Sequence, residues 1–111
     1  MRWIGSSKRD LRDMPKGARA VFGHELGEVA EGKTPAGAKV LKGFGGADVL
    51  ELRADAEDGT FRAVYTVRFE GFVYVLHCFQ KKSTKGIATS KQDVELIKAR
   101  LKDAELLAKE V

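Results

Sequence analysis

The sequence contains little cysteine and little histidine. Cys78 is its single cysteine, and His24 and His77 are its two histidines, among 111 residues. One thiol excludes an intramolecular disulfide, so we expect a reducing compartment. His77 and Cys78 are neighbours on a predicted strand and face opposite sides of it, which argues against a shared metal ion. We therefore expect no metal site and no cofactor, and we expect Cys78 to be a small buried hydrophobic residue.

Long apolar runs are also missing. The densest apolar stretch, Phe72–Phe79, is far too short to cross a bilayer. The first residues lead at once into the polar run Ser6–Asp10 rather than into an apolar segment, so no signal peptide is expected. These features predict a cytoplasmic protein.

What the sequence does contain is a globular composition with an excess of positive charge. Hydrophobic residues make up 43% and charged residues 32% of the chain, which excludes a disordered protein. The length predicts a single domain over residues 1–111. The formal net charge of +4 favours an anionic partner, although many basic proteins with other functions share it.

The N-terminal third is predicted to be helical. After a short strand at Arg2–Gly5, helical sequence runs from about Ser7 to Glu31, with Ser6 or Ser7 as the cap, and Pro15 divides it into two pieces. The second piece carries an apolar stripe and ends before a glycine-rich loop over residues 32–48. The stripe consists of Ala18, Val21, Phe22, Leu26 and Val29.

Three strands and a helix are predicted next. The strands are Val49–Ala54, Phe61–Phe69 and Phe72–Lys81. The helix runs from about Ser90 to Lys109, with Ser90 as its cap and Asp93 at the reciprocal position of the capping box. The apolar stripe of this helix consists of Val94, Ile97, Leu101, Ala104 and Ala108. The element order predicts an α+β fold with a four-stranded, largely antiparallel sheet and all helices on one face.

The pairing of the last two strands follows from a predicted two-residue turn at Glu70-Gly71. This turn places Val67 opposite Tyr74, Tyr65 opposite Leu76 and Ala63 opposite Cys78, and side chains then alternate between two faces. The predicted core face consists of Phe61, Ala63, Tyr65, Val67, Phe69, Phe72, Tyr74, Leu76 and Cys78. A slip of one residue would reverse this assignment.

The opposite face is predicted to be free of helices and to carry the functional side chains. Its charged and aromatic members are Glu51, Arg53, Asp55, Arg62, Arg68, His77, Phe79 and Lys81, above an apolar floor of Val64, Val73 and Val75. RNA binding requires cations that bind the phosphates and an aromatic ring that stacks on a base. The alternative is an ordinary solvated face whose charges have no specific role.

Three strand segments carry a resemblance to a known family. They are Leu50-Glu51-Leu52-Arg53, Phe61-Arg62-Ala63-Val64-Tyr65 and, most specifically, the strand that ends in Phe79-Gln80-Lys81-Lys82-Ser83. With the opening Trp3–Leu11 and the helix after Ser90, they cover nearly the whole chain. Here the sequence resembles the phage-derived, HigB-like branch of the RelE/ParE superfamily of toxins from type II toxin–antitoxin systems.

This resemblance implies a RelE-like fold and a helix-turn-helix antitoxin as partner. It also implies metal-free cleavage of messenger RNA, typically on the ribosome. Arg62 matches an arginine that family members place on the phosphate, and Lys82, or Lys81 beside it, matches the residue assigned to transition-state charge or to the leaving group. Arg53 matches a position that is often lysine or arginine. Glu51 departs from RelE, where a cation is expected.

The remaining expectations concern the base and the substrate contacts. RelE uses a tyrosine in its C-terminal segment, which this sequence lacks. His77 is the expected substitute base, or else a strand histidine with a local hydrogen bond. Arg53, Arg68, Phe79 and Lys85 are expected to bind the substrate. Lys85 could instead be solvated charge. Two other functions remain open: a ParE-like toxin that poisons DNA gyrase without nuclease chemistry, and a non-toxic binding or regulatory protein that has kept the fold.

Overall fold

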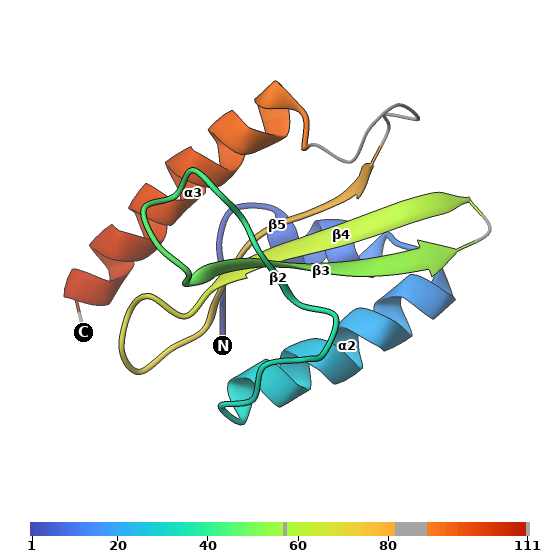
Figure 1. The fold of residues 1–111 in the computed structure, drawn as a ribbon, viewed down its shortest axis with the longest axis horizontal. Helices are drawn as coiled ribbons and strands as arrows, with labels where there is room; N and C mark the ends of the chain where they lie inside the picture. The colour runs from blue at the N-terminus through green and yellow to red at the C-terminus, as the bar shows by residue number, and fades with distance from the viewer. Residues whose placement is uncertain (57, 82–88, 111) are drawn as a thin grey trace.

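The computed structural model describes residues 1–56, 58–81 and 89–110 (Figure 1). Its helices are α1 (Ser7–Arg12), α2 (Lys16–Ala30) and α3 (Lys91–Lys109). Its strands are β1 (Arg2–Trp3), β2 (Lys39–Val40), β3 (Val49–Ala56), β4 (Gly59–Thr66) and β5 (Tyr74–Lys81). They form one sheet in the order β1-β5-β4-β3-β2, with β1 parallel to β5 and all other neighbours antiparallel.

The α+β class is confirmed, but the predicted four-stranded sheet is wrong. Within the described residues the sheet has five strands, because β2 lies in the segment that was predicted to be loop. Lys39 pairs with Glu51 and Val40 with Leu50. Two strand residues within a glycine-rich segment give no periodic pattern that would distinguish them from loop.

The division of the N-terminal helical segment at Pro15 is confirmed. Pro15 precedes α2 with a φ of −55°, and Gly32 follows it with a φ of 86°, a conformation that glycine adopts without strain. Ser6 precedes α1 as predicted, but it is not a standard cap. Its hydroxyl donates to Asp10 Oδ2 at 2.6 Å instead of accepting from the backbone.

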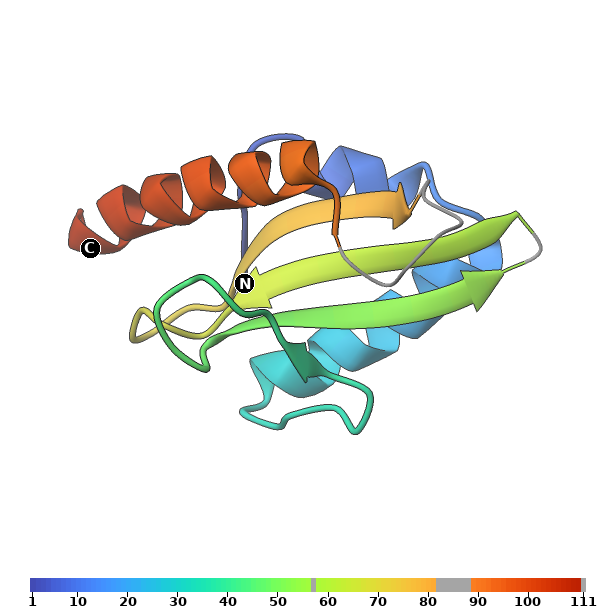
Figure 2. The same cartoon turned by 45° about the horizontal axis from the view of Figure 1, so that its top comes forward.

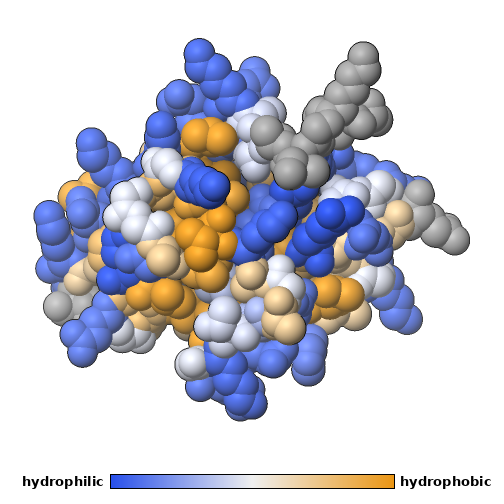
Figure 3. Space-filling model, in the orientation of Figure 1, coloured by the Kyte–Doolittle hydropathy of each residue, from blue (hydrophilic) through white to orange (hydrophobic). Residues whose placement is uncertain are grey.

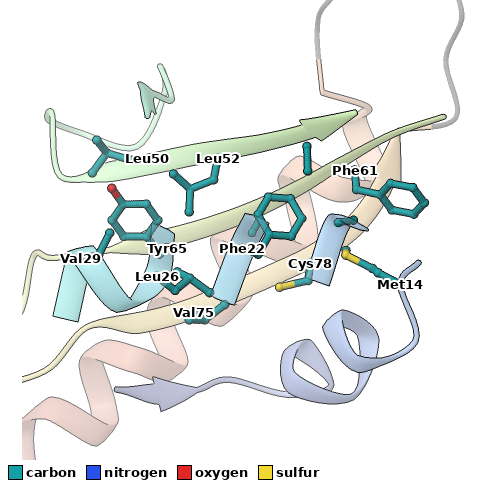
Figure 4. Close-up of a cluster of buried hydrophobic side chains, with 13 residues drawn as sticks. Met14, Phe22, Leu26, Val29, Leu50, Leu52, Phe61, Tyr65, Val75 and Cys78 are labelled. Carbon is teal, nitrogen blue, oxygen red and sulfur yellow. The ribbon is translucent and has the colours of Figure 1, made fainter. Parts of the chain in front are cut away.

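The helices cover both faces of the sheet, so the prediction that they share one face is wrong. Figures 1 and 2 show α2 below the strands and α3 above them. The face toward α2 is packed with apolar side chains that point toward one another (Figure 4). These are Met14, Ala18, Phe22, Leu26, Val29, Leu50, Leu52, Ala54, Phe61, Ala63, Tyr65, Val75 and Cys78. Val21 is not among them: it was predicted to join the stripe, but it is 40% exposed.

A second cluster lies between the sheet and α3. It consists of Ile4, Phe44, Val49, Val64, Tyr74, Leu76, Ile97 and Ala104. The predicted stripe of α3 is confirmed, since Ile97 and Ala104 are fully buried and Val94, Leu101 and Ala108 pack against the same cluster. The face that was predicted to be free of helices is therefore covered by α3.

The hairpin between β4 and β5 differs from the predicted one near its turn. Residues 67–73 form a loop rather than a two-residue turn, and the pairing shifts between Val64 and Tyr65. Ala63 pairs with Cys78 as predicted, but Tyr65 pairs with Val75, so Leu76 is an extra residue in the ladder. This bulge turns Tyr74 and Leu76 toward α3 and Val75 toward α2, the reverse of the predicted faces.

The loop itself leaves the sheet because it is tied to the segment before β3. Val67 N and Thr66 Oγ both donate to Asp48 O, at 3.0 and 2.7 Å. As a result Val67, predicted to be in the core, is 48% exposed, while Phe69 and Phe72 pack on the edge of the second cluster. Across residues 1–56, 58–81 and 89–110, no helix has the length and apolarity to cross a membrane.

Candidate functional site

The α3 face of the sheet is divided into an apolar half and a charged half. In the charged half, the register aligns Arg53, Arg62 and Phe79 in one row across three strands. The next row toward α3 holds Glu51, Val64 and His77, and the outer row holds Asp55, Thr60 and Lys81. We call Glu51, Arg53, Arg62, His77, Phe79 and Lys81 the charged region. Figure 3, in the orientation of Figure 1, shows an apolar patch left of the centre of the molecule with hydrophilic side chains to its right.

The centre of the charged region is a buried ion pair. Arg62 Nη1 donates to Glu51 Oε1, and the two side chains are only 8% and 4% exposed. Thr89 Oγ approaches the other carboxylate oxygen of Glu51 at 3.5 Å. Arg62 was predicted to stand on an open face; instead its side chain is buried against Glu51. Its partner is Glu51, which strand alternation placed on the same face as Arg53 and which departs from RelE.

Arg62 keeps one donor without an acceptor. Its Nε is buried and makes no hydrogen bond to any residue that the structure describes. A buried donor left unsatisfied costs about 1–3 kcal/mol, so an anionic group next to it would be stabilised. This is the one feature of Arg62 that points to a ligand rather than to a purely structural ion pair.

Arg53 is the accessible cation of the region. Its side chain is 57% exposed, and its Nε donates to Asp55 Oδ1 at 3.2 Å. Thr60 Oγ1 donates to the same oxygen at 3.0 Å, and these two bonds lower the pKa of the Asp55 carboxyl group. Arg53 lies directly opposite Arg62 on the neighbouring strand. Like charges so placed repel each other, and the Glu51 carboxylate that bonds Arg62 offsets part of this repulsion.

Lys81 belongs to the same electrostatic environment. The pKa of its ammonium lies below the usual value, first because of desolvation and then because of repulsion from Arg62, Arg53 and Lys39. Attraction by Glu51 acts in the opposite direction. A lowered pKa makes an ammonium group a better proton donor near neutral pH.

His77 is held by a helix and by an aromatic ring. Its Nε2 lies 2.8 Å from Asp93 Oδ1 at the start of α3, and its ring stacks on Phe79 with centroids 4.3 Å apart and an interplanar angle of 13°. Burial lowers the pKa of His77, while Asp93 and Asp10 raise it and Arg100 lowers it; the net shift is downward. His77 is therefore mostly neutral at pH 7.

Several predicted site residues do not join this region. Arg68 lies at the far end of the sheet, where its Nε donates to Asp48 Oδ1 at 3.0 Å and its Nη2 donates to Phe44 O. It anchors the loop before β3, and its predicted role in substrate binding finds no support in this position. Lys82 and Lys85 lie outside the described residues.

Cys78 occupies the predicted buried position on the opposite face from His77. It is 2% exposed, and burial raises the pKa of its thiol to about 12, so it is not a nucleophile at neutral pH. Among the residues with a described position, no group of three or more His, Cys, Asp or Glu side chains could hold a metal ion.

Two residues of the site were missed as members of it. Asp93 was recognised only as part of the helix cap, and nothing local in the sequence places it over His77, because that contact depends on how α3 returns to the sheet. Glu51 could have been found: strand alternation sets it on the same face as Arg53, and a lone carboxylate among cations predicts an ion pair.

Comparison with known proteins adds one finding. No curated protein matches the chain. A family model described as "Phage derived protein Gp49-like (DUF891)" matches residues 9–102. The matched segment extends from α1 through most of α3 and includes every residue of the charged region. The chain belongs to the phage-derived Gp49-like family.

Proposed function

We propose that this protein is the toxin of a type II toxin–antitoxin system, with a RelE-like fold, and that it cleaves messenger RNA. The observation that carries the proposal is the charged region. Two arginines, a lysine, an imidazole and an aromatic ring lie on adjacent strands in a chain of the phage-derived Gp49-like family. The resemblance to the HigB-like branch of the RelE/ParE toxins supports the same function.

The proposed reaction is attack by the RNA 2′-oxygen on the adjacent phosphorus. The phosphorus–O5′ bond breaks, and the products are a 2′,3′-cyclic phosphate and a 5′-hydroxyl. The reaction needs a base, an acid and cations for the charge that grows on the phosphoryl oxygens. Arg53 and the unpaired Nε of Arg62 are suited to that charge, and Phe79 is suited to stack on a base. Lys81, with its lowered pKa, is suited to protonate the leaving oxygen.

The test is inducible expression followed by mapping of new 5′ ends on cellular RNA. We expect new ends within minutes of induction. Arg53→Ala removes an exposed cation without disturbing the core. We expect this variant to cleave RNA roughly tenfold more slowly or worse, because the transition state loses one charge-assisted hydrogen bond. Arg19→Ala, an exposed arginine on α2, is the matched control and should cleave like the wild type.

A helix-turn-helix antitoxin is proposed as the partner. Co-expression of the neighbouring reading frame should restore growth and yield a complex that co-purifies. Growth arrest with broken DNA and no new RNA ends would identify a gyrase poison and contradict the nuclease.

The second candidate is a binding protein that has kept the fold without catalysis. The buried Glu51–Arg62 pair favours it, because an arginine neutralised by a carboxylate is already satisfied at one nitrogen. This candidate predicts neither growth arrest nor new RNA ends on expression. The Arg53→Ala variant would then differ from the wild type only in RNA binding, measured by filter retention.

A further inference from the structure

The structure also assigns a role to Asp93, a residue of the α3 cap. We propose that Asp93 is a positioning residue that fixes the proton of His77 on Nε2, so that Nδ1 is the base for the RNA 2′-hydroxyl. This inference rests on the proposed function and specifies which atom of the site performs the first proton transfer.

The argument begins with the carboxylate of Asp93. Its Oδ2 accepts from Ser90 Oγ at 2.6 Å, and its Oδ1 lies 2.8 Å from His77 Nε2. Both oxygens are thus engaged, and the side chain is 28% exposed. Because an ionised carboxylate can only accept, the imidazole must donate from Nε2. In the neutral ring the proton is then on Nε2, and the lone pair is on Nδ1.

The stacked ring of Phe79 also holds the plane of the His77 imidazole. The Nδ1 atom of His77 is buried and has no hydrogen-bond partner among the residues that the structure describes. An unsatisfied buried acceptor costs stability, so its persistence calls for an explanation. A hydroxyl group of a substrate would supply the missing donor.

His77 also lines a hollow on the surface beside β5. The hollow has a volume of about 310 Å³ and lies between α1 and the outer half of β5. Its lining comprises Asp10, Asp13, Met14, Phe61, His77, Cys78, Phe79 and Gln80. We infer that the ribose approaches Nδ1 from this side, while the phosphate meets Arg62 and Arg53 across the strand.

The protonation state of His77 agrees with the role of a base. Burial lowers the pKa of the imidazole, and the positive charge of Arg100 on α3 lowers it further. The carboxylates of Asp93 on α3 and Asp10 on α1 raise it, but the net pKa stays below its ordinary value. Its neighbour on β4, Val64, carries no charge. In the reaction, Nδ1 takes the proton of the 2′-hydroxyl as the oxygen–phosphorus bond forms. The 5′-oxygen leaves with a proton from Lys81, and exchange with water restores both groups.

The tautomer can be measured without any RNA. Two-dimensional ¹⁵N–¹H spectra of imidazole side chains distinguish a protonated from an unprotonated ring nitrogen. His24→Gln, a change at an exposed position, leaves His77 as the single histidine to observe. We expect Nε2 to be protonated and Nδ1 to be unprotonated at pH 7. Asp93→Asn should produce a mixture of the two tautomers, whereas Asp103→Asn, on the exposed side of the same helix, should produce no change.

The cleavage rate then distinguishes a catalytic role of His77 as a base from a purely structural hydrogen bond to Asp93. His77→Gln places an amide nitrogen near the position of Nε2, so it can still donate to Asp93, but it has no counterpart of Nδ1. We expect this variant to keep its melting temperature within a few degrees and to lose roughly 100-fold or more in cleavage rate, the range for general base catalysis. Asp93→Asn should shift the acidic limb of the pH–rate profile to lower pH, because Asp93 raises the pKa of His77.

The outcomes distinguish this inference from the proposed function. A folded His77→Gln protein that cleaves like the wild type would overturn the inference and leave the nuclease in place. Protonation of Nδ1 in the wild type, or a tautomer unchanged in Asp93→Asn, would also overturn it. If the wild-type protein leaves RNA uncut, both the proposed function and the role of His77 as a base are contradicted. The NMR measurement of the His77 tautomer still decides whether Asp93 positions the ring.

Discussion

The two faces of the sheet differ in the kinds of side chain that they bury. The face toward α2 buries apolar side chains that need no partner, and among the described residues it leaves no buried polar side-chain atom unsatisfied. The face toward α3 buries Glu51, Arg62 and His77 beside an apolar half built on Ile97 and Ala104. Within residues 1–56, 58–81 and 89–110, the buried side-chain atoms without a partner are Arg62 Nε, His77 Nδ1 and Tyr74 OH, and all belong to residues on this second face.

This difference indicates where stability and function are concentrated. Apolar packing is non-directional and contributes to stability in proportion to the area removed from water. Buried charges stabilise a fold only when each is paired, and otherwise they cost more than they contribute. We therefore expect the α2 face to carry most of the stability, and the charged region to be retained for binding and chemistry.

The largest expected effect is on the α2 face. Phe22 is fully buried on α2 at the centre of the first cluster (Figure 4). Phe22→Ala should lower the free energy of unfolding by about 4 kcal/mol, because it removes a large apolar side chain and leaves a cavity. Urea denaturation followed by circular dichroism measures this loss. A loss below about 1 kcal/mol would mean that the α2 face is not the main core.

The charged region should respond next, and with a different signature. Glu51→Ala leaves Arg62 buried without its carboxylate and should cost about 3 kcal/mol. The double variant Glu51→Leu, Arg62→Met removes both charges at similar volume and should be roughly as stable as the wild type. If the double variant is as unstable as Glu51→Ala, then the ion pair itself contributes stability, and the contrast between the two faces fails.

The sequence predicted this contrast only in part. Alternation assigned Arg62, His77 and Phe79 to one face and Ala63 and Cys78 to the other, and the structure confirms all five. It failed from Leu76 toward the loop. The bulge there and the hydrogen bonds of Thr66 and Val67 to Asp48 depend on contacts between distant segments, which no local pattern contains.

The cap of α3 should have a smaller effect than the ion pair. Ser90 Oγ accepts from Asp93 N at 3.2 Å, as the sequence predicted, and it also donates to the Asp93 carboxylate. Ser90→Ala should cost about 1 kcal/mol, the usual cost of losing a cap. Lys91→Ala, next to it in the first turn, is the control for helix propensity. Equal stability of the two variants would show that the cap contributes nothing.

The site was less predictable than the fold because its partners come from distant elements. Arg53, Arg62 and His77 could be grouped from strand alternation alone. Asp93 could not, since the stripe of Ile97 and Ala104 fixes which side of α3 meets a sheet but not which sheet face it covers. The error of placing all helices on one face therefore hid the partner of His77.

The smallest effect is expected at Val21, next to Phe22 on the same helix. The sequence pattern grouped both residues in one apolar stripe, yet Val21 is 40% exposed and Phe22 is fully buried. Val21→Ala should change the free energy of unfolding by no more than about 0.5 kcal/mol, because little apolar area is lost and alanine favours the helix. Urea denaturation of both variants compares the free energies of unfolding and so indicates which side of α2 faces the sheet. Comparable losses at the two positions would mean that α2 presents a different side to the sheet, and the composition of the first cluster would then be wrong.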